Sequence, residues 1–288
     1  MEVMDYLILS IIGLAMGLFG GLLGIGGSSV MIPAMMLAFG QDQHLYQAAA
    51  MLCNFFVSIS AVVVHRKRGS LSWNLLGWLI PAAAAGIITG VWISNSPLFE
   101  GDNSYLLARC FGVFLVYVAI YNICKLKSTA KKSVESEQTN CAEQSKIKTS
   151  AIGLFTGLGA GLLGIGAGTI STPFQQLFLK VPIRSAISNS SAIITCVALI
   201  GGAYKTLTLA EHGTEPVEAV RIAAIIVPTA IAGGYIGGHL MHKLPVKIVR
   251  IVFIALVIFA SCKMLTTKQQ RPEKVFDAQA TTEPSVSR

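Results

Sequence analysis

Residues 13–33 read GLAMGLFGGLLGIGGSSVMIP, and residues 153–173 repeat this stretch as GLFTGLGAGLLGIGAGTISTP. At a constant offset of 140 the two copies agree at 11 of 21 positions without a gap. Self-similarity at a fixed offset is typical of a chain built from related structural units. The repeat therefore predicts that the protein consists of two related halves.

The composition around the repeat is that of a membrane protein. The chain of 288 residues is 53% hydrophobic and 12% charged, whereas a soluble domain averages about 25% charged residues. Its apolar runs are continuous rather than alternating, and several exceed the roughly 20 residues that a helix needs to cross a bilayer. We predict an all-α polytopic membrane protein and exclude a water-soluble globule and a β-barrel. The predicted parts are a first membrane repeat at 1–124, a cytoplasmic linker at 125–148, a second membrane repeat at 149–265 and a disordered tail at 266–288.

The basic residues mark the cytoplasmic loops. Fourteen Lys and Arg residues fall in one set of loops and a single one, Lys205, in the alternate set. The basic loops are 65–74, 125–148, 180–184 and 242–250, and the others are 40–46, 95–104 and 205–217. By the positive-inside rule the basic set is cytoplasmic. We expect a multi-pass protein of the plasma (inner) membrane with both termini outside.

This topology turns the two halves into an inverted pair. Each half begins with a glycine-rich helical hairpin, 6–39 or 151–179, that leaves from and returns to the same side. Three transmembrane helices follow each hairpin, at 47–64, 75–95 and 105–124 and at 185–204, 220–241 and 246–265. An odd number of crossings per half inverts the second half, as in many secondary transporters, and predicts eight to ten membrane segments.

The hairpins are too long for one helix and short for two. Two arms of about 17 residues reach roughly 25 Å each, less than a hydrocarbon core of about 30 Å. We therefore expect re-entrant hairpins that turn near the middle of the membrane. Backbone N–H and C=O groups freed at that depth must be buried in protein or face a polar cavity.

The glycines divide into two classes. Gly13, Gly17, Gly21, Gly153, Gly157 and Gly161 recur every fourth position, the small-xxx-small spacing of packed membrane helices. Gly24, Gly26, Gly164 and Gly166 break this spacing and lie beside Ser or Thr. Such a turn, followed by the positive end of a helix, favours an anion, although close helix packing is the alternative.

Hydroxyl and amide side chains supply the other candidates. Asn189, Ser190 and Ser191 form the densest cluster of this kind at membrane depth; they are suited to a small oxyanion and equally to hydrogen bonds between helices. Lys205 ends its helix, where a steering or gating role competes with interfacial anchoring. The predicted substrate-binding residues are Gly24, Gly26, Gly27, Ser28, Ser29, Asn54, Gly164, Gly166, Gly168, Thr169, Gln175, Asn189, Ser190 and Ser191.

Other kinds of site are not expected. The six cysteines form no CxxC pair, which argues against a disulfide framework and a zinc site. Residues 159–164 match G-x-G-x-x-G but lack the strand and the acidic residue of a dinucleotide site. We predict no cofactor, no metal, no nucleic-acid partner and no enzymatic activity, because no acid, base or metal-ligand cluster lies at recognisable spacing.

The motifs together resemble a known family. The stretches GLFGGLLGIGGSSVMIPAM at 17–35, GLGAGLLGIGAGTISTPF at 157–174 and HRKRGSLSW at 65–73 are similar to those of the sulfite exporter family TauE/SafE, also called toluene-sulfonate uptake permeases. The resemblance covers about residues 6–265. It implies secondary transport of small sulfur-containing or organic anions such as sulfite, sulfonates or sulfoacetate across the lipid bilayer.

Two alternatives stay open at the level of sequence. Carbonyl oxygens from the same turns would serve a cation or metal-ion permease. The sequence also leaves open whether copies of the chain assemble as a homo-oligomer.

Overall fold

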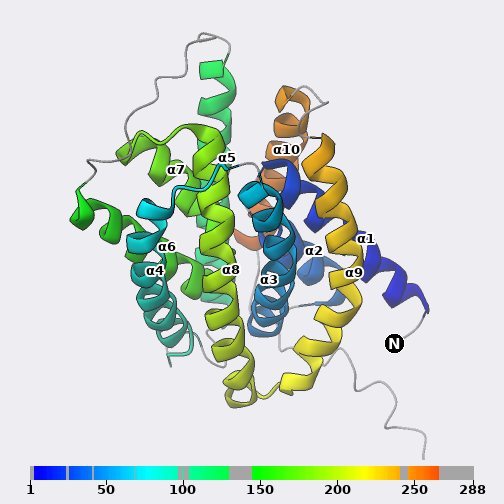
Figure 1. The fold of residues 1–288 in the computed structure, drawn as a ribbon. Helices are drawn as coiled ribbons and strands as arrows, with labels where there is room; N and C mark the ends of the chain where they lie inside the picture. Colours follow the sequence, from blue (N-terminus) through cyan, green and yellow to red (C-terminus); the bar gives the residue numbers. More distant parts are fainter. Residues whose placement is uncertain are drawn as a thin grey trace, which may run out of the picture.

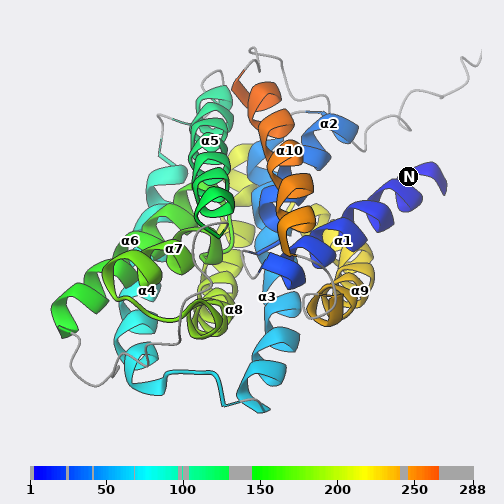
Figure 2. The same ribbon diagram turned by 90° about the horizontal axis from the view of Figure 1, so that it is seen from above.

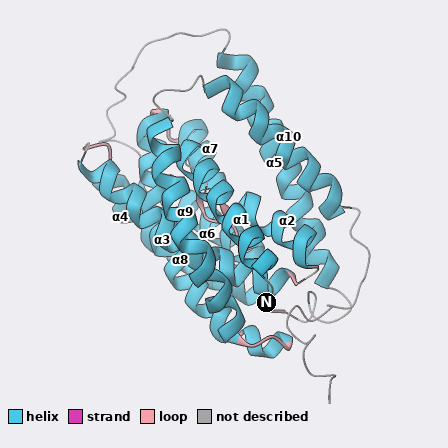
Figure 3. Ribbon diagram, turned by 90° about the vertical axis from the view of Figure 1, so that its right-hand side faces the viewer, coloured by secondary structure: helices cyan, strands magenta, loops and turns pink. Residues whose placement is uncertain are grey.

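The described part of the chain folds almost entirely into helices. A computed structural model describes residues 3–23, 26–40, 42–67, 69–96, 99, 104–129, 145–240 and 246–265. The helices are α1 (Val3–Leu23), α2 (Ser28–Phe39), α3 (Gln43–Lys67), α4 (Trp73–Ser94), α5 (Ser104–Thr129), α6 (Lys146–Leu163), α7 (Gly168–Phe178), α8 (Ile183–Leu207), η4 (Leu209–His212), α9 (Pro216–Leu240) and α10 (Val246–Leu265). These described residues contain no strand (Figure 3).

The all-α membrane fold predicted from composition is confirmed. Within the described part of the chain, six helices are long and apolar enough to cross a bilayer: α1, α3, α4, α5, α8 and α9. The protein is therefore an integral, multi-pass membrane protein. Gly24, the linker residues 130–144 and the tail 266–288 lie outside the described residues.

The hairpin arms differ from the equal arms expected. α1 has 21 residues and α2 has 12, whereas α6 has 18 and α7 has 11. The glycine turns lie well past the centre of each hairpin, so the first arm takes most of its length. The second arms reach only about 18 and 17 Å at 1.5 Å per residue, too short to cross hydrocarbon.

The two halves exchange packing partners. α3 and α8 run side by side through the centre, with α4 and α6 on one flank and α1 and α9 on the other (Figure 1). α5 and α10 pack against each other, as a second view shows (Figure 2). Thus α1 of the first half packs on α9 of the second, and α6 of the second on α4 of the first. A two-fold relation between the halves would produce this pairing; their inverted orientation in a membrane stays a prediction.

Glycine makes the flanking pairs possible. A side chain on Gly17 would strike the backbone of α9 at Ala230, and one on Gly157 the backbone of α4 at Ala83. Gly13, Gly153 and Gly161 also meet the partner helix's backbone. The packing interpretation is confirmed for these five glycines.

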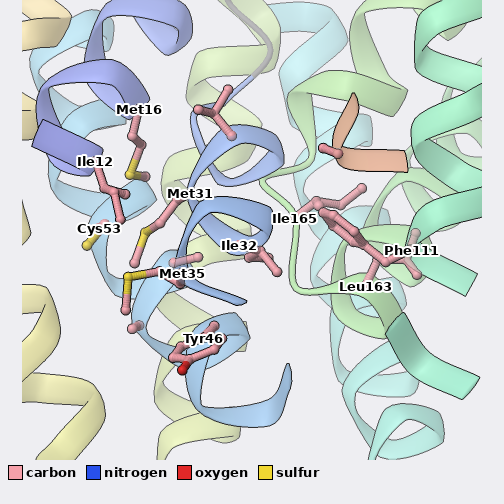
Figure 4. Packing of buried hydrophobic residues seen from close by; sticks show 14 of the residues in the cluster. Ile12, Met16, Met31, Ile32, Met35, Tyr46, Cys53, Phe111, Leu163 and Ile165 are labelled. Carbon is pink, nitrogen blue, oxygen red and sulfur yellow. The ribbon is translucent and has the colours of Figure 1, made fainter. Parts of the chain in front are cut away.

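The apolar core lies between the hairpins and the central helices. Met16, Met31 and Met35 gather between α1, α2 and α3, while Phe111 and Leu163 extend the same cluster toward α5 and α6 (Figure 4). All five side chains are buried. This core holds the short arms α2 and α7 against longer helices, which gives them the tertiary support that their length cannot.

Polar contacts tie the loops together at one end of the molecule. Asp42 caps α3, because its Oδ1 accepts a hydrogen bond from the Leu45 N–H at 3.0 Å. Its Oδ2 accepts another from Thr214 Oγ1 at 3.1 Å. Across the same end, Asn95 Nδ2 donates to Thr208 Oγ1 at 2.7 Å. These bonds join the start of α3 to the α8–α9 connection and the end of α4 to the end of α8.

Candidate functional site

The two glycine-rich turns meet inside the protein. The Gly166 N–H of the second turn donates a hydrogen bond to Ser28 Oγ at the start of α2, with an N–O distance of 2.9 Å. A methyl group added to Gly26 would lie 3.5 Å from Gly166 Cα. Residues 138 positions apart, near the tips of the two hairpins, are therefore in direct contact.

Glycine is required where the chain leaves its first arm. Gly164 ends α6 with φ 67°, and Gly26 precedes α2 with φ 82°. Both values lie in the left-handed region, which side chains other than glycine's disfavour. The sharp reversal lets α2 and α7 start beside each other.

The N-terminal ends of α2 and α7 are uncapped at this junction. Gly27 and Ala167 precede the two helices and provide no side-chain hydrogen bond to them. The first N–H groups of a helix have no partner within it, and they carry the positive end of its dipole. Two such ends directed at one place favour a negatively charged ligand.

Asn54 of α3 packs on both turns. Its Oδ1 lies 3.7 Å from where a methyl group on Gly26 would be, and its Nδ2 lies 3.0 Å from the same position on Gly166. Ile194 of α8 also lies close, with its Cγ2 3.5 Å from that position on Gly166. Asn54 and Ile194 are both about midway along their 25-residue helices. The junction therefore lies at the mid-level of the two central helices.

Several buried polar atoms around the junction have no hydrogen-bond partner among the described residues. They include Asn54 Nδ2 and Ser29 Oγ, whose side chains are 2% and 0% exposed. An unpaired buried donor loses its hydration without compensation, so each such group is available to a ligand. These groups are neutral and include donors, which suits an oxyanion.

The predicted cluster on α8 is occupied by contacts within the protein. Asn189 Nδ2 donates to Gln175 Oε1 at 3.1 Å, and Asn189 Oδ1 accepts the Ser72 N–H at 3.0 Å. Ser190 Oγ accepts hydrogen bonds from Thr172 Oγ1 at 2.9 Å and Gln175 Nε2 at 3.2 Å. The bonds with Gln175 and Thr172 fasten α7 to α8, and the bond from Ser72 fastens the start of α4 to α8. This is the interhelical interpretation; a substrate role for the cluster stays a prediction.

The remaining predicted residues fall into three groups. Gly27 packs on Met16 of α1, and Gly164 packs on Gln47 of α3. Gly168 and Thr169 open α7, where the Thr169 hydroxyl donates to Gly166 O at 3.4 Å. Ser191 Oγ donates to a carbonyl of its own helix, 3.0 Å away. Gly24 is outside the described residues.

Gln47 and Gln43 are functional candidates that the sequence reading missed. Both are buried, and both have an amide N and O without a partner. They precede Asn54 by 7 and 11 positions, a spacing that puts all three on one face of α3. This spacing was a usable signal, but two glutamines near a predicted loop gave no reason to expect burial.

No group of three or more His, Cys, Asp or Glu side chains that could hold a metal occurs among the residues the structure describes.

Comparison with known proteins connects this architecture to a family. A profile described as sulfite exporter TauE/SafE matches residues 9–264. The chain is 27% identical to the probable membrane transporter protein MamO of Magnetospirillum gryphiswaldense, over 92% of this chain and 46% of MamO. It is 23% identical to the probable membrane transporter protein YunE of Bacillus subtilis, over 91% of this chain and 98% of YunE.

The relatives differ in length. The chain spans just under half of MamO but nearly all of YunE, and it covers 91% of the probable membrane transporter protein MJ0441 of Methanocaldococcus jannaschii at 26% identity. No solved structure matches. Because the profile covers both glycine-rich turns and the helices that hold them, the chain belongs to the sulfite exporter TauE/SafE family of membrane transporters.

Proposed function

We propose that the protein is a secondary transporter of small anions such as sulfite, sulfonates or related organic anions. The observation that carries the proposal is the meeting of two uncapped helix N-termini, joined by the Gly166 N–H to Ser28 Oγ hydrogen bond. The family description supports sulfur oxyanions as the substrate class.

The proposed mechanism is alternating access around this junction. The two halves are inverted, so one hairpin enters from each face of the membrane. The substrate binds between Ser28, Ser29, Asn54 and the Gly166 turn. The Ser29 and Asn54 groups without partners supply hydrogen bonds to it, and the helix ends supply positive potential. Rocking of one half against the other then exposes the junction to either side. In this proposal the protein lies in the plasma membrane with its basic loops in the cytoplasm.

One feature of the structure favours the alternative, a cation permease. Pro33 and Pro173 lie inside α2 and α7. A proline lacks an N–H, so each frees the carbonyl four residues earlier, at Ser29 and Thr169. Carbonyl oxygens beside the junction are suitable ligands for a cation.

Transport measurements separate the two functions. Protein purified into liposomes is expected to accumulate radiolabelled sulfite, and unlabelled methanesulfonate to compete. Gly166→Val is expected to abolish uptake, because its side chain would press on Asn54 Nδ2. The control is Gly77→Val in α4, where an added Cβ meets no atom within 4 Å. Uptake of a cation that is insensitive to the anion contradicts the anion proposal, and full sulfite uptake by Gly166→Val contradicts a substrate site at this turn.

A further inference from the structure

A buried lysine, Lys205, lies away from the junction and has no charged partner among the described residues. Lys205 is only 1% exposed, so it is not the interfacial anchor that its place at a helix end suggested. Its Nζ donates a hydrogen bond to Ser94 Oγ of α4, and it pairs with no carboxylate of the described residues. A buried ammonium group without a counter-ion is unfavourable. The position therefore requires an explanation beyond anchoring.

The register of the central helices places Gln47 opposite Lys205. α3 and α8 run antiparallel in the structure: Thr195 Oγ1 donates to Ser58 Oγ at 2.9 Å, and a side chain on Gly202 would lie 3.4 Å from Met51 Cβ. Moving forward along α8 from these contacts means moving back along α3. Three residues beyond Gly202, Lys205 is level with positions 47 and 48.

The contacts of Gly201, one helical turn before Lys205, indicate that Ser94 and Gln47 lie beside Lys205. Gly201 touches both Met51 of α3 and Ile87 of α4. Lys205 lies one helical turn after Gly201 on α8. Gln47 lies one turn before Met51 on α3, and Ser94 lies two turns after Ile87 on α4. Residues separated by three, four or seven positions share a helix face. All three side chains thus face the space where α3, α4 and α8 meet.

The side chains in this layer are suited to an anion. The Gln47 amide is fully buried, and neither its Nε2 nor its Oε1 has a partner. Gln47 also contacts Gly164, so the second turn closes the layer on one side. An ammonium, a hydroxyl and an amide N–H₂ are hydrogen-bond donors that can converge on the oxygens of one anion.

We propose that Lys205, Ser94 and Gln47 form a second anion-binding site for a sulfite or sulfonate group. The site lies two helical turns along α3 from Asn54, about 10 Å at 1.5 Å per residue, on the side of the 205–217 loop. The idea that this site passes on the transported anion rests on the proposed function. The bound anion is the counter-ion that Lys205 lacks among the described residues.

The test is anion-dependent stabilisation of the purified full chain. Unfolding temperature is measured while sodium sulfite, or redox-inert sodium methanesulfonate, is titrated at constant ionic strength. Lys205→Met is expected to weaken the apparent Kd at least tenfold, yet to unfold no earlier than wild type without the anion, because an unpaired charge is removed. Lys67→Met, the same change at an exposed lysine of α3, is expected to keep the wild-type Kd.

A second variant covers the case in which Lys205→Met does not fold. Gln47→Glu places a carboxylate beside the ammonium and is nearly isosteric, so it should raise the unfolding temperature without added anion and reduce the gain from sulfite to the part that the junction provides. A wild-type Kd in either variant overturns the second site.

The proposed transport function is judged separately by uptake into liposomes. Stabilisation that depends on Lys205, in a protein that moves no sulfite, supports the site and contradicts transport. Sulfite uptake by wild type together with a wild-type Kd in Lys205→Met supports transport and overturns the site.

Discussion

At the scale of the residue, the Asp42 carboxyl is largely buried, and its hydrogen bonds offset only part of the cost of burying its charge. Burial raises the pKa of the Asp42 carboxyl above its usual value, while the bonds from Leu45 and Thr214 lower it and do not cancel the effect. The folded protein therefore binds this proton more tightly than the unfolded chain. The contribution of Asp42 to the stability of the folded protein is fully present at pH values below the unfolded pKa of about 3.9. It is lost as the pH rises through the folded pKa.

Asp42→Asn is expected to be as stable as wild type or more stable at pH 7 to 8, with the advantage shrinking as the pH falls toward 4. Asparagine still caps α3 but carries no buried charge. Asp42→Ala removes the cap and should lower stability by about 1 kcal/mol. Thermal unfolding of the detergent-solubilised protein at several pH values measures both effects. A wild-type advantage over Asp42→Asn that grows with pH would contradict the assignment.

At the scale of the element, the pairs α1–α9 and α4–α6 depend on backbone-to-backbone contact. Gly157 of α6 lies against the Ala83 carbonyl of α4 so closely that even a methyl group has no room. Gly157→Ala is expected to lose about 1–3 kcal/mol through overpacking. Gly77→Ala, at a position with open space, should be neutral or stabilising, because alanine has the higher helix propensity. The measurement is the unfolding temperature of each variant, and equal values for the two variants would exclude tight packing at Gly157.

The repeat predicted these elements well because the spacing of glycines shows which face of a helix the backbone of another helix can approach closely. Spacing of four identified the packing glycines, and the break in spacing identified turns that meet in the structure. The unequal arms were not predicted, because apolar residues continue through the turn without a change in composition. Gln47 and the burial of Lys205 were missed for another reason. The spacing of Gln47 and Asn54 along α3 was a usable signal, but the side chains of α8 that lie opposite them depend on the register between α3 and α8. These helices start 140 positions apart, and periodicity within one segment does not encode their register.

At the scale of the whole molecule, the inverted arrangement makes opposite predictions for the starts of the two hairpins. In a background without native cysteines, Met4→Cys is expected to react with a membrane-impermeant maleimide on intact cells. Ile147→Cys should react only after permeabilisation. Both native side chains are exposed. Glu211→Cys, in a loop predicted to be outside, serves as the positive control. Labelling of Met4→Cys and Ile147→Cys from the same side would exclude inverted halves.

The exchange of partners between the halves also bears on how the protein is made. α1 is synthesised before its packing partner α9, which begins only at Pro216. Until α9 is made, Gly13 and Gly17 lack the helix that they contact in the folded protein, and until Gly166 is made the first turn lacks the second. The first half consequently stays an incomplete intermediate while the second half is synthesised, and the junction can form only after every helix of the first half has been made.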